Sequence, residues 1–319
     1  MNTTEVVVDG LAFPECPRWC TDGLWFSDQH GGQIFRIRPG GGAEVMAEIP
    51  GGPSGLGWMP DGTLLAVSMH EKKLFEVGLA DSDADSDPGS GSGSAANGEG
   101  AALTVVSDLG PYHPGLSNDM VVDAAGRCYI GNIGYDIYGG EERRTTVLVL
   151  VDLTTGPGRA GAGPSGRDRP LVEPRVVADD LTVPNGTVIT PEGDRMIIAE
   201  SLAQRLTSFR IAADGSLSDR QVFADLGEET PDGICLDADG GIWFASVNEH
   251  QVVRVEEGGT VTDRIATSGR RAIACMLGGG DRRDLYVCAT RTLDPNKSRE
   301  ILGGSIEVCR VDVPGAGLP

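Results

Sequence analysis

Five polar residues of this sequence recur at one position of a short repeated segment and suit the binding of a hard metal ion. The segments read FPECPRW, GGPSGLGW, GLSNDMVVD, TVPNGTVIT and ETPDGICLD. When they are aligned, one column holds Glu15, Ser54, Asn118, Asn185 and Asp232. Carboxylate and amide oxygens suit Ca²⁺, Mg²⁺ or Mn²⁺, and Zn²⁺ tolerates them. A sixth segment, GRRAIACML, continues the series, but its residue in this column is uncertain and lies near Arg271.

The same residues have a simpler interpretation as turn formers. Asn and Asp are common in turns, and P-x-G and P-D-G are ordinary turn sequences. Any one of these residues, taken alone, would more often belong to a turn than to a metal site. The coincidence of two carboxylates and two amides in one register is what favours the metal site.

A longer repeat positions this column. A turn with Gly or Asp, an apolar strand and a small residue recur six times, as DGLWFS, DGTLLAVS, AGRCYIGN, GDRMIIAES, DGGIWFAS and RRDLYVCAT. Each copy is preceded by an apolar strand and followed by a second strand of alternating pattern, such as QIFRI or QVVRV. A further strand often closes the unit. Each repeat unit thus has roughly four strands in about 40–50 residues, which is the size of a propeller blade.

The repeat predicts an all-β fold, a six-bladed β-propeller with four antiparallel strands per blade. The last unit lacks its own outer strand after Val313, and a spare strand, Glu5 to Val8, precedes the first unit. We therefore expect the N-terminal strand to complete the last blade and leave no open edge. Because the innermost strands of a propeller line its channel, the column residues should meet at the channel mouth.

Two stretches interrupt the repeat without shifting it. Residues 81–102 are acidic and rich in Gly and Ser, and residues 156–170 read GPGRAGAGPSGRDRP. Both are too polar to bury a core, so we expect disordered loops within one propeller domain that spans residues 1–319.

Composition excludes several classes of function. The net charge of −21, without a basic stripe, is unsuited to nucleic acid or anionic lipid. No apolar run approaches the ~20 residues of a membrane helix, and the first ten residues do not resemble a signal peptide.

Seven scattered cysteines form no disulfide framework and predict a reducing cytoplasm. Cys16 and Cys20 could pair or bind metal, but two free thiols are favoured. Nothing in the sequence indicates a dimer over a monomer.

The ordered motifs PECPRW, SNDMVVD, PNGTVIT and PDGICLD resemble the SMP-30/gluconolactonase/regucalcin family over essentially the whole chain. The resemblance implies that Glu15, Asn185 and Asp232 bind one divalent cation. It also implies that Asn118 lies near the metal, contacting substrate or a metal-bound water, and that Asp119 supports this geometry. We expect Ca²⁺ first, with Mg²⁺, Mn²⁺ or Zn²⁺ as alternatives. Lactone hydrolysis is the activity that the resemblance implies.

One residue departs from the pattern of the sugar lactonases. Their Arg two residues before the Asn, which grips a sugar acid, is replaced here by Leu116. This favours a less polar lactone or ester over an aldonolactone. His30, Asn132 and Tyr135 are further candidates for the substrate site at the channel mouth.

The predicted mechanism uses the metal as a Lewis acid on the lactone carbonyl and Asp232 as the general base for the attacking water. No G-x-S-x-G, P-loop or H-E-x-x-H motif suggests another chemistry. Two alternatives remain. The propeller could be recruited to another metal-assisted reaction, such as a cyclisation or isomerisation in a biosynthetic pathway. It could also be a non-enzymatic binding propeller of the NHL or WD40 type, which would typically lack the converging column.

Overall fold

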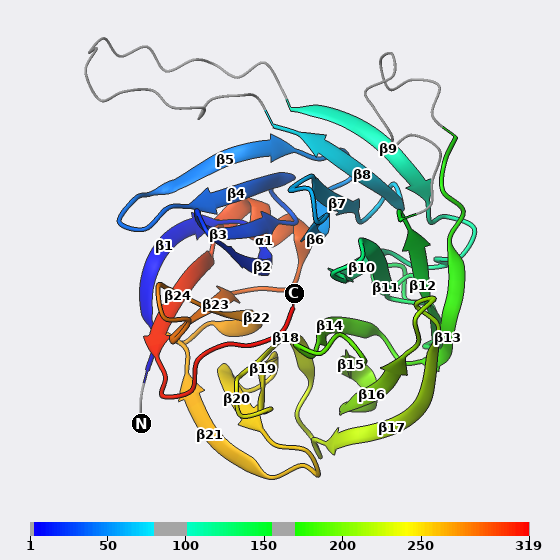
Figure 1. Ribbon diagram of the computed structural model, residues 1–319. Helices are drawn as coiled ribbons and strands as arrows, with labels where there is room; N and C mark the ends of the chain where they lie inside the picture. The colour runs from blue at the N-terminus through cyan, green and yellow to red at the C-terminus, as the bar shows by residue number, and fades with distance from the viewer. Residues whose placement is uncertain (1–2, 80–100, 155–169, 319) are drawn as a thin grey trace.

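Six four-stranded sheets surround a central axis in this protein (Figure 1). The computed structural model describes residues 3–79, 101–154 and 170–318. All strand pairs within the six sheets are antiparallel. The predicted six-bladed propeller is therefore confirmed. The loops predicted at 81–102 and 156–170 lie almost entirely outside the described residues, and Ala102 is already the first residue of a strand.

Blades 1 to 3 follow one another along the chain, each running from the inner to the outer strand. Blade 1 contains β2 (Pro14–Cys20), β3 (Gly23–Asp28), β4 (Gln33–Ile37) and β5 (Ala43–Glu48). Blade 2 contains β6 (Pro53–Trp58), β7 (Leu64–Ser68), β8 (Lys73–Gly78) and β9 (Ala102–Asp108). Blade 3 contains β10 (Ser117–Val122), β11 (Arg127–Asn132), β12 (Thr146–Asp152) and β13 (Arg175–Leu181).

Blades 4 to 6 continue the same order. Blade 4 contains β14 (Pro184–Ile189), β15 (Arg195–Glu200), β16 (Arg205–Ile211) and β17 (Leu217–Asp225), with a short 3-10 turn at Ser201–Ala203. Blade 5 contains β18 (Pro231–Leu236), β19 (Ile242–Ser246), β20 (Gln251–Val255) and β21 (Val261–Ala266). Blade 6 contains β22 (Arg271–Gly278), β23 (Asp284–Thr290), β24 (Gly304–Arg310) and β1 (Glu5–Leu11).

The hydrophobic core lies between neighbouring blades. Leu65 and Val67 of β7 pack with Met120 and Ile130 of blade 3 in one buried cluster. A second cluster joins blades 4 and 5 in the same way. The second strands of the blades are almost entirely buried, as in β7 and β11, which explains their largely apolar sequences. The outer strand β13, by contrast, exposes four of its seven residues. The inner strands are thereby held in place around the axis.

The ring closes by strand pairing between the two ends of the chain. β1 pairs with β24, with Val6 opposite Glu307 and Val8 opposite Ile306. Asp9 of β1 also forms an ion pair with Arg270, at 2.8 Å between its Oδ1 and the arginine Nη2. The predicted closure of the last blade by the N-terminal strand is therefore confirmed.

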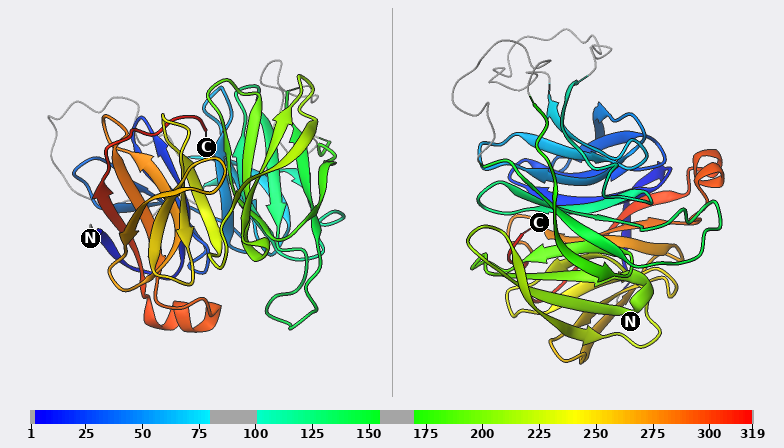
Figure 2. Two further views of the ribbon diagram at one scale, coloured as in Figure 1. Left: turned by 90° about the horizontal axis from the view of Figure 1, so that it is seen from below. Right: turned by 90° about the vertical axis from the view of Figure 1, so that its right-hand side faces the viewer.

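Two additional segments cover opposite faces of the ring (Figure 2). The helix α1 (Pro295–Ile301) lies between β23 and β24, on the face where the inner strands begin, and Asp294 caps its first turn by accepting two backbone N–H bonds. The tail after β24 crosses the ends of inner strands on the other face. There Leu318 exchanges two backbone hydrogen bonds of 2.9 Å with Ile189. Among the described residues, no helix is long and apolar enough to span a membrane.

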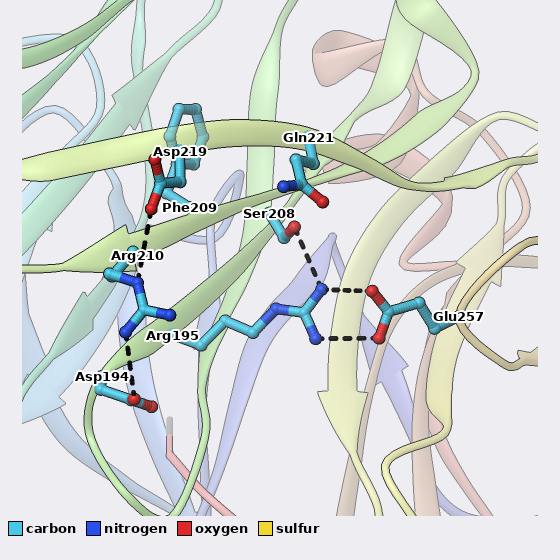
Figure 3. Close-up of a pocket in the computed structure, with 8 residues that line it drawn as sticks. All are labelled: Asp194, Arg195, Ser208, Phe209, Arg210, Asp219, Gln221 and Glu257. Atoms are coloured by element: carbon cyan, nitrogen blue, oxygen red, sulfur yellow. Dashed lines mark hydrogen bonds and ion pairs between the residues drawn. The ribbon is translucent and has the colours of Figure 1, made fainter.

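A pocket on the outside of blade 4 lies away from the axis (Figure 3). Arg195 makes a bidentate ion pair with Glu257 there, with N–O distances of 2.6 and 2.9 Å, and also donates to Ser208 Oγ. Arg210 lies between Asp194 and Asp219, at 3.9 and 3.4 Å. Both guanidinium groups of this outer pocket are therefore already paired with carboxylates.

Candidate metal centre

The inner strands share a register that places the predicted column at one level. In the inner strands of blades 2 to 5, the first paired residue is followed by the column residue, and the ladder then shifts register. Glu15 of β2 occupies the same place, directly before a register shift. In β22 the corresponding residue is Ala272, which follows the Arg271–Thr290 pair. The uncertain sixth position is thus occupied by a small, buried alanine.

Close packing of the inner strands brings these positions together. A Cβ atom on Gly186 would lie 2.5 Å from the backbone nitrogen of Ile234, and one on Gly233 would lie 2.3 Å from Ala274 Cβ. Real Cβ atoms do not approach so closely, so the strands next to the axis are in backbone contact only because glycine follows Asn185 and Asp232. The glycine of P-N-G and P-D-G therefore has a packing role in addition to any role in a turn.

Three buried oxygen atoms of the column have no hydrogen-bond partner. Asn185 donates from Nδ2 to Ser201 Oγ at 3.2 Å, which fixes the amide and leaves its buried Oδ1 without a partner. Oδ1 of Asp232 is also buried and has no hydrogen-bond partner. Asn118 donates from Nδ2 to Pro184 O at 3.3 Å, and Glu15 accepts the backbone N–H of Cys16. Ser54 Oγ is a third buried polar atom without a partner.

The carboxylates at this level repel one another. Burial raises the pKa of Glu15 well above its usual range, and the neighbouring charges of Asp232 and Asp119 raise it further. Burial, together with the charge of Asp119, raises the pKa of Asp232 to about 8. Ionisation of both carboxyls at the axis is therefore unfavourable in the protein alone.

These side chains fit a hard divalent cation. Unpaired buried acceptors are costly, and a cation that they coordinate removes that cost together with the carboxylate repulsion. Among the described residues, no group of three His, Cys, Asp or Glu side chains is arranged for a metal ion. The candidate set is of another kind, with the carboxylates of Glu15 and Asp232 and the amides of Asn118 and Asn185.

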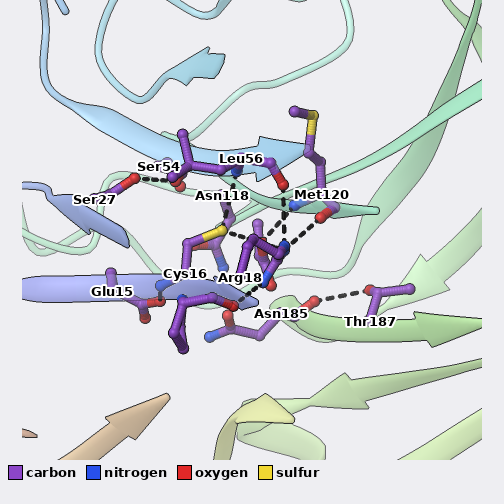
Figure 4. A network of polar contacts seen from close by, with 12 residues as sticks. Glu15, Cys16, Arg18, Ser27, Ser54, Leu56, Asn118, Met120, Asn185 and Thr187 are labelled. Atoms are coloured by element: carbon purple, nitrogen blue, oxygen red, sulfur yellow. Dashed lines mark hydrogen bonds and ion pairs between the residues drawn. The ribbon is translucent and has the colours of Figure 1, made fainter. Parts of the chain in front are cut away.

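A buried arginine beneath this set is a feature that the sequence analysis missed (Figure 4). The guanidinium of Arg18 donates from Nη2 to Asp119 Oδ1 and to Met120 O, both at 2.7 Å. Its Nε donates to Leu56 O at 3.0 Å and its Nη1 to Pro17 O at 3.0 Å. One side chain of blade 1 therefore contacts the inner strands of blades 2 and 3.

Cys16 and Asp119 belong to the same network and occupy positions where other blades have glycine. Cys16 Sγ lies 2.9 Å from Asp119 Oδ1 and accepts the backbone N–H of Leu56 at 3.0 Å. The equivalent residues in blades 2, 4 and 5 are Gly55, Gly186 and Gly233. The signal was present in the aligned segments, because PEC and SND carry a side chain where PSG, PNG and PDG do not.

The structure also places the three residues predicted for the channel mouth. His30, in the β3–β4 turn, has its ring centre 4.3 Å from that of Phe13 and its Nδ1 2.6 Å from Ser298 Oγ of α1. Burial and the charge of Arg299 lower the pKa of His30 to about 4, so the ring is neutral at neutral pH. His30 therefore lies on the face where the inner strands begin and joins α1 to blade 1.

Asn132 and Tyr135 are both buried near the start of β10. Asn132, the last residue of β11, donates from Nδ2 to Val147 O at 2.9 Å and accepts from Thr146 Oγ1 at 2.7 Å. Its amide is thus engaged within blade 3. Tyr135 lies in the following loop, with its backbone close against Gly115. Substrate contact by either residue stays a prediction.

Comparison with known proteins identifies similar sequences over most of the chain. A family model described as the SMP-30/Gluconolactonase/LRE-like region matches residues 13–291. The 6-deoxy-6-sulfogluconolactonase of Pseudomonas putida is 25% identical over 315 residues, which cover 96% of this chain and 93% of that protein. The L-arabinolactonase of Azospirillum brasilense is 26% identical over 277 residues, covering 86% of this chain and 79% of its own.

Solved structures share the fold. A luciferin-regenerating enzyme superposes with a TM-score of 0.76 at 15% sequence identity, over 100% of this chain and 99% of its own. A regucalcin from Agrobacterium tumefaciens, described as a calcium-binding protein, has a TM-score of 0.72 and 21% identity, over 100% and 97% of the two chains. At these identities the structural likeness shows the propeller fold alone.

Proposed function

Because the chain belongs to the SMP-30/gluconolactonase/LRE-like family, we propose that it is a divalent-metal-dependent hydrolase that opens a lactone or a related ester ring. The observation that carries the proposal is the convergence of Glu15, Asn185 and Asp232 with two buried oxygens left unpaired. Relatives named as lactonases support the same reaction class at about 25% identity. We expect Ca²⁺ first, as the regucalcin likeness suggests, with Mg²⁺, Mn²⁺ or Zn²⁺ as alternatives.

Glu15, Asn185 and Asp232 would hold the ion, with Asn118 beside it. A bound divalent cation would supply Lewis acidity, which stabilises the negative charge that develops on the carbonyl oxygen. The remaining chemistry belongs to the side chains. Asn118 would orient the substrate with its amide group, and Asp119 would hold the backbone of β10 in place through its bond from Met120 N.

Asp232 is assigned as the general base. In the first step a water oxygen forms a bond to the carbonyl carbon while its proton passes to the Asp232 carboxylate. In the second step the ring C–O bond breaks and the same proton passes to the leaving ring oxygen. The product is an open-chain hydroxy acid, and Asp232 returns to its starting state.

Leu116 points to a substrate that is less polar than an aldonolactone. It lies two residues before Asn118, where the sugar lactonases place a gripping arginine, and it is partly buried. An apolar side chain there would favour an alkyl substituent on the lactone ring and would leave sugar hydroxyls unpaired.

All seven cysteines are free, which supports the expected reducing cytoplasm.

The test is hydrolysis of a lactone panel by protein stripped with EDTA and then supplied with Ca²⁺, Mg²⁺, Mn²⁺ or Zn²⁺. The panel contains aliphatic γ- and δ-lactones beside gluconolactone. We expect activity to vanish on stripping, to return with one ion, and to favour the aliphatic lactones. Tight metal binding without hydrolysis of any lactone or ester would instead support a family member recruited to another metal-assisted reaction.

A further inference from the structure

The Arg18–Asp119 pair places two buried charged side chains next to the metal centre. Asp119 Oδ1 accepts from Arg18 Nη2 and from Met120 N, both at 2.7 Å, and lies 2.9 Å from Cys16 Sγ. That oxygen is fully engaged below the column. Asp119 nevertheless lies at the centre, because it directly follows Asn118 on β10 and contacts Cys16, the residue that follows Glu15.

Arg18 supplies positive charge at the same place. Its side chain is almost completely buried, so water screens it little. Arg18 lies on the same strand as Glu15, and its positive charge opposes the effect of the Asp119 and Asp232 carboxylates on the Glu15 carboxyl. Coordination of a cation requires ionised carboxylates. With Glu15, Asp119 and Asp232 ionised and Arg18 protonated, the metal-bound centre has a formal charge of −2 before the charge of the ion is counted.

We propose that Arg18 sets the charge of the metal centre at −2, so that a divalent ion neutralises it and a trivalent ion leaves an excess. The inference rests on the metal site of the proposed function and extends it to the basis of ion selectivity. Arg18 acts through charge and through Asp119, and is therefore a positioning residue. The alternative role is a purely structural one, since Arg18 also joins the inner strands of three blades.

Ion selectivity separates the two roles. The Coulomb energy of an ion scales with its own charge, so an added negative charge favours La³⁺ over Ca²⁺. Damage to the fold or to ligand positions weakens the binding of both ions together. The ratio of the two dissociation constants, Kd for Ca²⁺ over Kd for La³⁺, therefore reports the charge of the centre.

The experiment measures this ratio by isothermal titration calorimetry with CaCl₂ and LaCl₃ on the full chain after removal of metal by EDTA. R18M makes the formal charge of the centre more negative, at −3. D119N makes it less negative, at −1, and R18M/D119N restores −2. We expect the ratio to rise roughly tenfold in R18M, because one unit charge within about 10 Å at an effective dielectric near 20 has that influence. It should fall by a similar factor in D119N and return close to the wild-type value in the double variant.

R195M is the matched control. It removes the same unit of charge from the outer pocket, where the guanidinium is partly exposed and paired with Glu257. We expect its ratio to equal that of the wild type. A shift in R195M as large as that in R18M would overturn the proposal, because net charge alone would then explain the selectivity.

The remaining outcomes are also decisive. If R18M binds Ca²⁺ but the ratio of the Ca²⁺ and La³⁺ dissociation constants is unchanged, the charge-setting role of Arg18 is overturned. The proposed hydrolase function is not affected by that result. If R18M does not fold, D119N decides, since a lowered ratio supports the proposal and an unchanged ratio overturns it. A wild-type protein that binds neither ion overturns the metal site of the proposed function, and the inference with it.

Discussion

Two arginine–carboxylate pairs in this propeller have similar geometry and opposite surroundings. Arg18 and Asp119 approach to 2.7 Å beside the channel, with side chains only 5% and 7% exposed. Arg195 and Glu257 approach to 2.6 Å in the outer pocket, with side chains 33% and 57% exposed (Figure 3). The outer pair is bidentate, whereas the inner arginine divides its donors between one carboxylate and three backbone carbonyls.

The difference shows that surroundings decide what such a pair does. Removing one partner of a buried pair leaves an uncompensated charge in a medium that solvates it poorly. Removing one partner of an exposed pair leaves a charge that water and salt screen within about 10 Å. The inner pair should therefore influence both folding and the proposed metal centre, while the outer pair should influence neither strongly. The following predictions test this contrast, from the largest expected effect to the smallest.

The largest effect should come from Asp232 at the channel. Asp232→Ala removes the base and a metal ligand and should abolish turnover. Asp232→Asn keeps an oxygen but not the base, and should lower kcat by about 10²–10⁴-fold. Both are measured with the preferred lactone of the panel at saturating metal. Glu257→Gln in the outer pocket is the matched control and should retain full activity; near-wild-type turnover in Asp232→Ala would refute the assignment.

Stability should depend strongly on Arg18. Arg18→Met leaves the Asp119 carboxylate buried without its cation and should lower the free energy of unfolding by about 3–5 kcal/mol. The measurement is urea unfolding in EDTA, which separates folding from metal binding. Adding Asp119→Asn should restore part of the loss, because no unpaired charge then remains. If Arg18→Met lowered the free energy of unfolding by less than about 1 kcal/mol, the buried pair would contribute no more to stability than the exposed Arg195–Glu257 pair.

Glu200, a buried carboxylate paired with the partly exposed Arg205, should make the free energy of unfolding depend on pH. Burial opposes ionisation of Glu200, but hydrogen bonds from Arg205, Thr207 and Thr182 N outweigh it and lower its pKa. A lowered pKa means that Glu200 contributes full stability above its unfolded pKa and loses it as pH falls through the folded one. Glu200→Gln should cost about 2 kcal/mol at pH 7.

The pH dependence itself checks this prediction. Thermal unfolding of wild type and Glu200→Gln is compared at pH 7 and at acid pH, in EDTA. The difference in Tm between the two proteins should shrink as the pH is lowered. A difference that stays constant with pH would mean that the ionised form of Glu200 is not what stabilises blade 4.

The smallest effect belongs to the outer pair. Glu257→Ala should lower the free energy of unfolding by no more than about 1 kcal/mol, because an exposed ion pair offsets little more than its own ordering cost. The remaining loss should decrease further in 1 M NaCl, where the Debye length is about 3 Å. Urea unfolding at low and high salt measures both. A salt-independent loss of several kcal/mol would remove the contrast between the two pairs.

Local pattern was sufficient to predict the blades and the column. Six copies of one turn-and-strand unit fixed the strand order, and the spare strand before Leu11 had one unpaired edge to join. Asn118, Asn185 and Asp232 were identified because equivalent positions of repeated units carry equivalent side chains. The sixth position could not be read from sequence, because only the pairing of Arg271 with Thr290 shows that Ala272 follows it.

Contacts between distant blades were beyond such reasoning. Arg18 and Asp119 are 101 positions apart, and nothing local to either residue specifies the other. The side chains of Cys16 and Asp119 at a glycine position were a visible clue, but their meaning depends on how closely the inner strands approach. The helix α1 was also missed, because seven residues form a stable helix only when the surrounding structure supports them.

The joint between β1 and β24 has a consequence for synthesis. Its partners are remote in the chain, as the contact between Thr4 and Glu307 across 303 positions illustrates. At about 5–20 residues per second, a ribosome makes the second partner roughly 15–60 s after the first. During that interval the N-terminal strand lacks its partner, because β24 has not yet been made and blade 6 is incomplete. We expect the nascent propeller to assemble blade by blade and to close only when its last strand has left the ribosome, so that chaperones would find their main substrate in the unclosed ring.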